Sequence, residues 1–376
     1  MKKIICLFLS FCLLLSLAAC GKKPKPTDPT DGLSGNNASQ ATTPSNHSGT
    51  AKPLIAVSVP TVTENTVKED GTLLFQYTYQ HMSFVLDKPD VADKVILDFL
   101  NRVDSTKELA DATAEMAKQY YNSKSWVPYL YHITYSPTRI DDKVLSLFGN
   151  NVVFTATTHP DRTCVSASYD LQTGDVLTLA SIMAKDATTD QICTLVLDGL
   201  KELAEGDYLY EGYQQTVKQR FQTDASTDEA WYLSTTGLCF YFAPYEIAPY
   251  SSGVISVEIP YEKLGNILHE AYLPDLIGTT SGNVTVSDFN AEKMSDIDHI
   301  AEIVVNNDGK MHLIQTDGII QDVKILQSDS ASNYTIFAAN MLSAGDGIVL
   351  QVDDSLLKNL KLTYKSNGET QVKPLG

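Results

Sequence analysis

One stretch of the chain concentrates the residue types that bind sugars and proteins by stacking. Aromatic residues make up 9% of the chain, but seven of the twenty residues from Trp231 to Tyr250 are aromatic. The side chains that could form a stacking platform for sugar rings or an amphipathic anchor for a protein partner are those of Trp231, Tyr232, Tyr241, Tyr245 and Tyr250. The alternative, which the pattern favours, is that these side chains pack the joint between a helix and a sheet.

Glu246 lies within the same aromatic stretch and has two interpretations. In an aromatic cleft its pKa would rise, and the residue could act as a general acid. The favoured alternative is a carboxylate that accepts backbone N–H bonds within its own loop. Pro244 and Pro249 predict that loop, because proline ends a strand ladder. The five candidate ligand-binding residues are therefore Trp231, Tyr241, Tyr245, Glu246 and Tyr250.

Recognised catalytic and metal-binding patterns are missing from the sequence. The seven histidines show no HExxH or HxH spacing, and the chain has no GxSxG elbow and no Walker A motif. Cys164, Cys193 and Cys239 show no CxxC spacing, so we expect three buried thiols and at most one disulfide. The sequence assigns no catalytic residue, no metal ligand and no cofactor, and it favours a protein that is not an enzyme.

The first twenty residues have the three parts of a signal peptide. Lys2 and Lys3 precede an apolar run from Ile4 to Leu17, and small residues follow. That run of about 14 residues is short for a membrane-spanning helix, which needs about 20. The string LAAC that ends at Cys20 resembles the bacterial lipobox, in which the cysteine receives lipid and becomes the first residue of the mature protein. We therefore expect signal residues 1–19, a palmitate-type lipid on Cys20 and a protein held on the membrane.

Composition supports an extracytoplasmic body on a flexible tether. Residues 20–52 hold mostly Pro, Gly, Ser, Thr, Asn and charged residues, so no core is expected there. The formal net charge is −18, and it becomes −20 when Lys2 and Lys3 leave with the signal. This acidic balance argues against a nucleic-acid partner, which would require a basic surface.

Hydrophobic periodicity predicts an α+β fold of antiparallel sheets with packed helices, followed by a small all-β C-terminal domain. Asp90 is expected to cap the helix of the first region, and residues 279–288 are expected to form a linker before the last one. The expected boundaries are 53–180 and 181–276 for two mixed regions and 277–376 for the β-rich domain. Strands are expected at 75–81, 129–135, 144–148, 152–157, 165–169, 238–242, 254–259, 301–305, 311–315, 319–326, 334–338, 347–352 and 360–364, and helices at 90–120, 192–203 (ended by Gly206) and 213–221.

Two regions resemble known extracytoplasmic families of Gram-positive bacteria. The string FYFAPYEIAPYSSG followed by VEIPYEKL resembles the RsiV-like family, which is catalogued as a domain of unknown function. The upstream strings DKPDVADKVILDFLN, VLSLFGNNVVFT and SYDLQTGDVLTLASIM are similar to the domain at the N-terminal side of PdaC-type peptidoglycan deacetylases. The chain lacks the TFDDG and HxxxH strings of the deacetylase catalytic domain and shows no anti-sigma segment.

The resemblance implies a module that binds a ligand at the cell wall. We expect a lipid-anchored protein on the extracytoplasmic face of the membrane that binds a peptidoglycan fragment or a cationic protein such as lysozyme. The alternative is a peptidoglycan-modifying enzyme, or an accessory subunit of one, with Glu246 and a histidine as acid and base.

Overall fold

A computed structural model describes eight parts of the chain. These are residues 55–86, 88–205, 208–222, 230–274, 280–290, 292, 299–328 and 333–376. The expected signal peptide, Cys20, the tether, the helix stop at Gly206 and the boundary at 276 lie outside the described residues.

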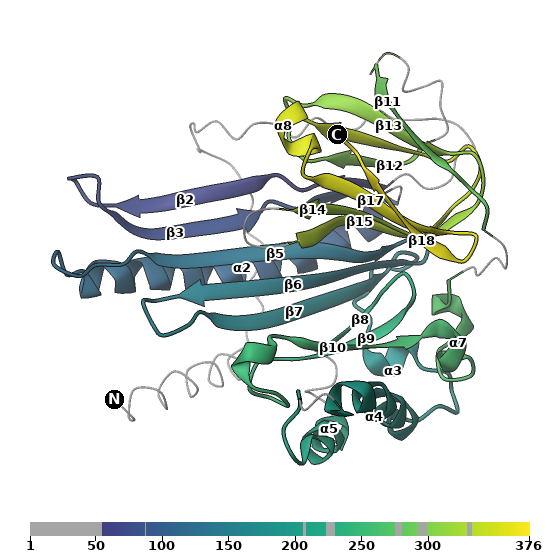
Figure 1. Ribbon diagram of the computed structural model, residues 1–376, viewed down its shortest axis with the longest axis horizontal. Coiled ribbons are helices and arrows are strands. Elements are labelled where there is room, and N and C mark those ends of the chain that lie inside the picture. The colour runs from purple at the N-terminus through teal and green to yellow at the C-terminus, as the bar shows by residue number, and fades with distance from the viewer. Residues whose placement is uncertain are drawn as a thin grey trace, which may run out of the picture. The chain divides into compact units, whose positions relative to one another are not determined.

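A five-stranded sheet forms the N-terminal part of the body (Figure 1). Only the pairing of β3 with β5 is parallel, because a helix connects these two strands. The two expected strands at 144–148 and 152–157 are one continuous strand, since Gly149 to Asn151 stay paired on both sides. In sheet order the strands are β2 (Thr61–Val67), β3 (Leu73–Gln80), β5 (Tyr129–Ile140), β6 (Val144–Phe154) and β7 (Asp161–Asp170).

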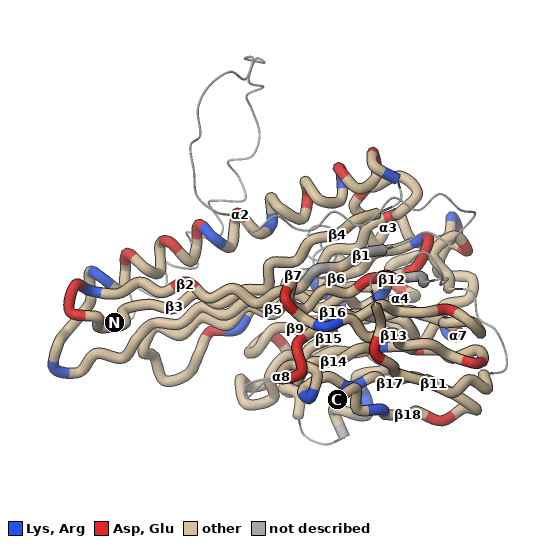
Figure 2. Tube along the Cα trace, turned by 90° about the horizontal axis from the view of Figure 1, so that it is seen from above, with Lys and Arg blue, Asp and Glu red and all other residues tan. Residues whose placement is uncertain are grey.

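Helix α2 (Pro89–Tyr120) covers one face of this sheet (Figure 2), and two of its charged side chains bond the sheet: Asp98 accepts from Tyr169 of β7, and Lys107 pairs with Glu64 of β2. Its inner side includes Phe99, whose ring packs edge-on against Tyr135 of β5 at 5.2 Å between centroids. The prediction that Asp90 caps the helix was wrong. The N-cap is Lys88, because Pro89 has a preset φ and no N–H to satisfy, so it occupies the first helical turn and Asp90 follows it there.

A six-stranded sheet contains strands from both the N-terminal and the C-terminal parts of the chain. β1 lies between β4 on one side and β12 on the other, and it pairs with β12 in parallel. Residues 284–289, which the sequence placed in a linker, form edge strand β11; its outer face is exposed, which explains its weak hydrophobicity. In order the strands are β11 (Val284–Phe289), β13 (Lys310–Thr316), β16 (Gly347–Val352), β12 (His299–Val304), β1 (Ile55–Ser58) and β4 (Ser83–Val85).

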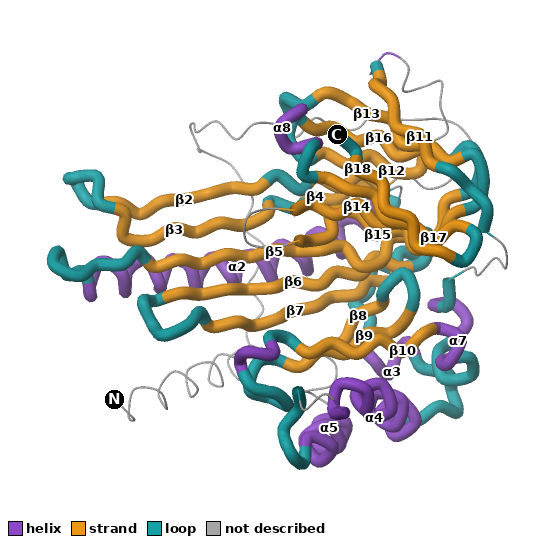
Figure 3. Tube along the Cα trace, in the orientation of Figure 1, coloured by secondary structure: helices purple, strands orange, loops and turns teal. Residues whose placement is uncertain are grey.

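A four-stranded antiparallel sheet completes the C-terminal region (Figure 3). The backbone N–H of Thr335 donates to Ser136 of β5 at 3.3 Å, so this sheet also contacts the N-terminal one. One hydrophobic core runs through α2, the N-terminal sheet and both C-terminal sheets. The strands are β15 (Asn333–Leu342), β14 (Ile320–Ser328), β17 (Leu360–Ser366) and β18 (Glu369–Pro374), and the one-turn helix α8 (Asp354–Leu357) precedes β17.

A second hydrophobic core lies in the middle of the sequence, between a three-stranded sheet and two helices. Gly199 allows helix α4 to approach this sheet closely, because a Cβ there would lie 2.3 Å from a methyl group of Val257. The elements are α3 (Leu179–Ile182), α4 (Thr189–Glu205), α5 (Tyr213–Gln222), β8 (Trp231–Leu233), β9 (Gly237–Phe242), η1 (Tyr250–Ser252), β10 (Ile255–Pro260), α7 (Tyr261–Leu264) and η2 (Glu270–Tyr272).

The predicted fold class, α+β with an all-β C-terminal region, is confirmed. The C-terminal region is not closed on itself, however, because β1 and β4 from the N-terminal part complete its larger sheet. Among the described residues, no helix combines the length and the apolar character required to cross a bilayer.

Candidate functional site

The loop between β9 and β10 presents Tyr245 at the surface. Two backbone bonds shape it: Glu246 N–H donates to Ala243 at 3.1 Å, and Tyr245 N–H donates to Ala248 at 3.0 Å. Tyr245 has a φ of 72°, a left-handed conformation that is unfavourable for a residue with a bulky side chain. Its side chain nevertheless remains 57% exposed, so the strained backbone holds an aromatic ring in solvent.

Three rings from two distant loops meet at this point, and we call them the aromatic cluster: His159, Tyr245 and Tyr250. The His159 ring stacks on Tyr250 with centroids 3.9 Å apart and an interplanar angle of 19°. The Tyr245 hydroxyl lies 2.9 Å from His159 Nε2, and the Tyr250 hydroxyl donates to the Pro160 carbonyl at 2.6 Å. The β6–β7 loop therefore supports the β9–β10 loop, and the result is a braced aromatic surface.

Glu246 orders the loop beneath this cluster. One carboxylate oxygen accepts the Ala243 N–H at 2.9 Å, and the other pairs with Arg220 of α5 at 3.0 Å. Burial lowers the pKa of the Arg220 guanidinium, and the Glu246 carboxylate acts in the opposite direction. This geometry is that of a loop-ordering carboxylate, the interpretation that the sequence favoured, because both oxygens already have partners.

Trp231 and Tyr241 lie apart from the aromatic cluster. Both are buried, with 3% and 4% of their surface exposed. Tyr241 packs against Phe148 of β6 with ring centroids 5.1 Å apart, and the Trp231 carbonyl accepts from Ser166 of β7 at 2.6 Å. Of the five candidate residues, these two therefore pack the middle sheet against the N-terminal sheet, and Tyr245, Glu246 and Tyr250 remain at the surface.

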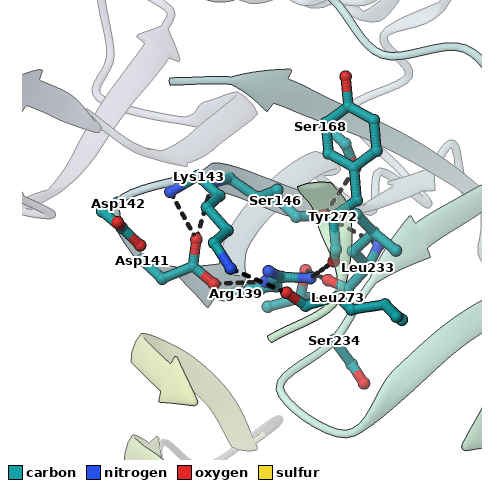
Figure 4. Close-up of polar contacts among 12 residues, drawn as sticks. Arg139, Asp141, Asp142, Lys143, Ser146, Ser168, Leu233, Ser234, Tyr272 and Leu273 are labelled. Atoms are coloured by element: carbon teal, nitrogen blue, oxygen red, sulfur yellow. Dashed lines mark hydrogen bonds and ion pairs between the residues drawn. The ribbon is translucent and has the colours of Figure 1, made fainter. Parts of the chain in front are cut away.

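A buried arginine joins the N-terminal sheet to the segment that follows β10 (Figure 4). Arg139 is fully buried; it pairs with Asp141 at 2.7 Å and donates to the Tyr272 carbonyl at 2.6 Å and to the Tyr261 hydroxyl at 2.9 Å. Burial opposes its charge, but Tyr261 and Asp141 outweigh burial and hold the pKa of Arg139 above its ordinary value. A buried arginine with these partners fixes the orientation of the middle region.

Hydroxyl side chains add further bonds between the two sheets around β8. Ser146 of β6 lies 2.7 Å from Ser168 of β7 and accepts the Leu233 N–H at 3.1 Å (Figure 4). Thr138 donates to the Leu233 carbonyl at 2.8 Å. Side chains of the neighbouring sheet thus bond the backbone N–H and carbonyl of Leu233 in the edge strand β8.

The cysteines and the remaining titratable groups suggest structural roles. All three cysteines are free thiols; Cys193 and Cys239 are buried as expected, but Cys164 is only half-buried. Burial raises the pKa of each thiol, that of Cys164 to about 12. A protonated thiol is a poor nucleophile and a poor metal ligand. Within the described residues, no group of three or more His, Cys, Asp or Glu side chains is arranged to hold a metal ion.

Sequence reasoning missed three residues that build this region: His159, Arg220 and Arg139. Strand parity would have misplaced Arg139, because a β-bulge between Pro137 and Arg139 turns it to the opposite face from Tyr131, Ile133 and Tyr135. His159 and Arg220 carry no local signal either, since they meet the β9–β10 loop only through the tertiary fold.

Comparisons with known proteins identify one domain. No curated protein matches this chain. A crystal structure of a DUF3298 family member from Bacteroides fragilis NCTC 9343 is 16% identical with a TM-score of 0.42, over 59% of this chain and 96% of that one. A DUF3298 family protein from Pseudomonas aeruginosa PAO1 is 18% identical with a TM-score of 0.42, over 58% of this chain and 98% of that one. Residues 182–262, which include the β9–β10 loop, match the family described as "Protein of unknown function (DUF3298)" and form a DUF3298 domain.

Proposed function

We propose that this chain is a lipid-anchored extracytoplasmic binding protein whose ligand is a peptidoglycan fragment or a cationic, lysozyme-like protein. The N-terminal sequence supports the anchor at Cys20, and the strings quoted above support an RsiV-like domain preceded by a PdaC-type region. The DUF3298 match at residues 182–262 is consistent with the first of these resemblances.

The exposed ring of Tyr245 is the observation that carries the proposal. A tyrosine that is 57% exposed at a φ of 72° gains little from packing, so its strained conformation suggests a functional role. His159 and Tyr250 brace that ring, which lowers the entropy lost when a ligand stacks on it. Such a surface suits the apolar face of a sugar ring or an apolar side chain of a protein partner.

The acidic charge supports the same class of ligand. A formal charge of −20 on the mature chain would raise the association rate of a cationic protein, and added salt would reduce that rate. Charge would not by itself select the partner, because steering depends on the summed field, whereas close contacts decide specificity. We therefore propose that the acidic surface raises the rate at which the ligand associates and that the aromatic cluster determines which ligand binds.

Calorimetric titration with lysozyme and with soluble muropeptides, over a range of salt concentrations, tests the binding proposal. We expect binding by the wild-type chain and a loss of about tenfold or more for Tyr245→Ala, because a central aromatic side chain contributes more than about 1.4 kcal/mol. Tyr120→Ala is the matched control, since Tyr120 is 61% exposed at the end of α2, on a different element. Absence of binding to both ligand classes at every salt concentration would refute the proposal.

Two further measurements test the lipid anchor and the alternative enzymatic activity independently of ligand binding. A palmitate analogue should label the wild-type chain, whereas Cys20→Ala should remain unlabelled and leave the membrane fraction; membrane retention of that variant contradicts the anchor. Muropeptide mass profiles of cell walls incubated with the protein should stay unchanged. New masses would instead favour the peptidoglycan-modifying alternative.

A further inference from the structure

A second surface segment, between helices α4 and α5, lies beside the β9–β10 loop. The Tyr210 N–H donates to the Ile247 carbonyl at 2.8 Å, and the Ser252 hydroxyl donates to the Tyr208 carbonyl at 3.5 Å. These bonds hold the two segments side by side. The α4–α5 segment and the β9–β10 loop therefore form one continuous surface.

Exposed tyrosines gather on this surface. Among the described residues, four tyrosine, phenylalanine or tryptophan side chains are exposed, and three of these are Tyr208 (59%), Tyr210 (41%) and Tyr245 (57%). We call these three side chains the tyrosine patch. Leu209 packs against the second hydrophobic core, so it anchors the segment while the tyrosines on either side of it stay in solvent. Apolar side chains exposed singly are ordinary, but a group of aromatic rings on adjoining segments marks an interaction surface.

The openness of the tyrosine patch favours a protein partner over a small wall fragment. Small-molecule sites bury most of their ligand in a cleft or cavity, whereas these three rings stand on the open surface. Tyrosine is also enriched in protein interfaces and among the residues that dominate their binding energy. The patch therefore suits a protein surface that covers the three rings together.

The charges beside the patch indicate which side chain of a protein partner fits it. Glu211 is exposed and directly follows Tyr210, so a carboxylate adjoins the rings. Arg220, which lies beneath the loop, is already paired with Glu246. A planar guanidinium can stack on a tyrosine ring and pair with a carboxylate, whereas an ammonium is a compact and strongly hydrated charge. Arginine therefore matches this surface better than lysine does.

We infer that the tyrosine patch and Glu211 extend the proposed binding surface and receive arginine side chains of a cationic protein. The inference rests on the proposed function, because it selects one of the two ligand classes and adds residues to the surface that carries Tyr245. It also gives a role to the α4–α5 segment, which belongs to the DUF3298 domain.

Two peptides of equal charge test the preference for arginine. Hexa-arginine amide and hexa-lysine amide are titrated by calorimetry into the full-length chain in detergent, at about 50 mM salt so that screening is modest. We expect hexa-arginine to bind about fivefold more tightly or better, because guanidinium groups stack on the tyrosine rings. Equal affinities of the two peptides would overturn the inference, since the surface would then attract charge without stacking.

Matched substitutions locate this preference in the tyrosine patch. The double variant Tyr208→Leu/Tyr210→Leu keeps apolar side chains but removes two rings, so its preference for hexa-arginine should fall to about twofold or less. Tyr208→Phe/Tyr210→Phe keeps the rings and should keep the preference. Tyr120→Leu removes an exposed ring from α2 and should bind both peptides as the wild type does. An unchanged preference in the folded leucine variant would overturn the inference.

The charge of Glu211 provides a second variant if the leucine variant does not fold. Glu211→Gln should weaken hexa-arginine binding about threefold, because it removes the carboxylate that pairs with the guanidinium. Glu270→Gln removes the same charge from the exposed helix η2, away from the patch, and should leave the affinity unchanged. Equal affinities of these two variants would reject the patch as the arginine site.

Lysozyme and soluble muropeptides separate this inference from the proposed function. Lysozyme should bind the leucine double variant about fivefold more weakly than the wild type. A loss of lysozyme affinity in Tyr245→Ala, with no loss in the leucine variant, would overturn the inference and leave the proposed function standing. Binding of muropeptides alone would do the same, because the partner would then be a glycan. Absence of binding to every probe would refute both.

Discussion

Two arginine–carboxylate pairs hold the middle region of this protein, and they differ in burial. Arg139 and Asp141 lie 2.7 Å apart with 0% and 18% of their side chains exposed, whereas Arg220 and Glu246 lie 3.0 Å apart with 13% and 28% exposed. The first pair lies at the end of β5, where Arg139 also bonds Tyr261 and Tyr272 of the middle region, and the second lies under a surface loop. The same chemistry therefore joins layers in one place and shapes a candidate binding surface in the other.

The difference shows how burial determines how much an ion pair contributes to stability. A fully buried guanidinium loses its hydration and must keep all its partners, so removing one leaves an uncompensated charge. A pair near the surface can exchange its partners for water and contributes less to global stability. We expect changes at Arg139 to affect unfolding of the whole body and changes at Glu246 to affect the β9–β10 loop first.

Arg139→Ala should have the largest effect of the changes considered. It leaves Asp141 without its buried partner and removes the bonds that join β5 to Tyr261 and Tyr272, so we expect a loss of about 3–5 kcal/mol in the free energy of unfolding. Urea denaturation followed by circular dichroism measures this loss. Arg139→Met keeps most of the volume and should be less destabilising; a loss below about 1 kcal/mol for the alanine variant would contradict the structural role.

Glu246→Ala should have an intermediate effect. The substitution removes the acceptor for Ala243 N–H and the partner of Arg220, so we expect a loss of about 2 kcal/mol. Glu211→Ala, a change at an exposed glutamate, should stay within about 0.5 kcal/mol of the wild type in the same denaturation experiment. Equal stabilities of the two variants would show that Glu246 does not order its loop.

Tyr245→Gly should separate stability from binding. Glycine adopts a φ of 72° without strain, so we expect the free energy of unfolding to stay equal or to rise by about 1 kcal/mol. The same variant loses the exposed ring and should lose affinity for the proposed ligand. A marked drop in melting temperature, measured by differential scanning calorimetry, would mean that the ring packs the loop instead.

The alkylation rate of Cys164 is the smallest of the expected effects and reports only on the surroundings of this thiol. Burial raises its pKa to about 12, so the thiol stays protonated well above the ordinary pKa of a cysteine. The rate of alkylation by iodoacetamide in the folded protein should therefore keep rising up to about pH 11, whereas that of an exposed thiol levels off near pH 9. The alkylation that disappears in the Cys164→Ser variant is the alkylation of Cys164. A plateau near pH 9 would show that the space between the sheets is open to solvent.

Local periodicity predicted the elements of the fold better than their arrangement. The alternation in β5 and β9 and the three- and four-residue spacing of α2 and α4 are properties of short segments, and the structure confirms these elements. The parallel pairing of β1 with β12 joins residues almost 250 positions apart in the sequence, for example Ile55 with Ala301. No local pattern encodes such a pairing, because the strands choose partners only when the core assembles.

The candidate site was predictable only in part, for the same reason. The prolines and aromatic residues of the β9–β10 loop indicated an ordered surface segment, and the loop is there. Proximity in sequence could not show that Trp231 and Tyr241 turn inward while Tyr245 turns outward. That division depends on the neighbouring sheet, which packs Phe148 against Tyr241 and supports Tyr250 through the Pro160 carbonyl.

If the proposed lipid anchor holds the chain at its N-terminal end, the position of β1 has a mechanical consequence. β1 begins at Ile55 and is hydrogen-bonded to a strand on each side, in parallel to β12 and in the opposite direction to β4. A pull directed along this strand would load both rows of hydrogen bonds in shear at once instead of opening them one by one. A drag force from flow or from a moving partner would then act first on a strand that is bonded on both sides and lies next to the edge strand β4.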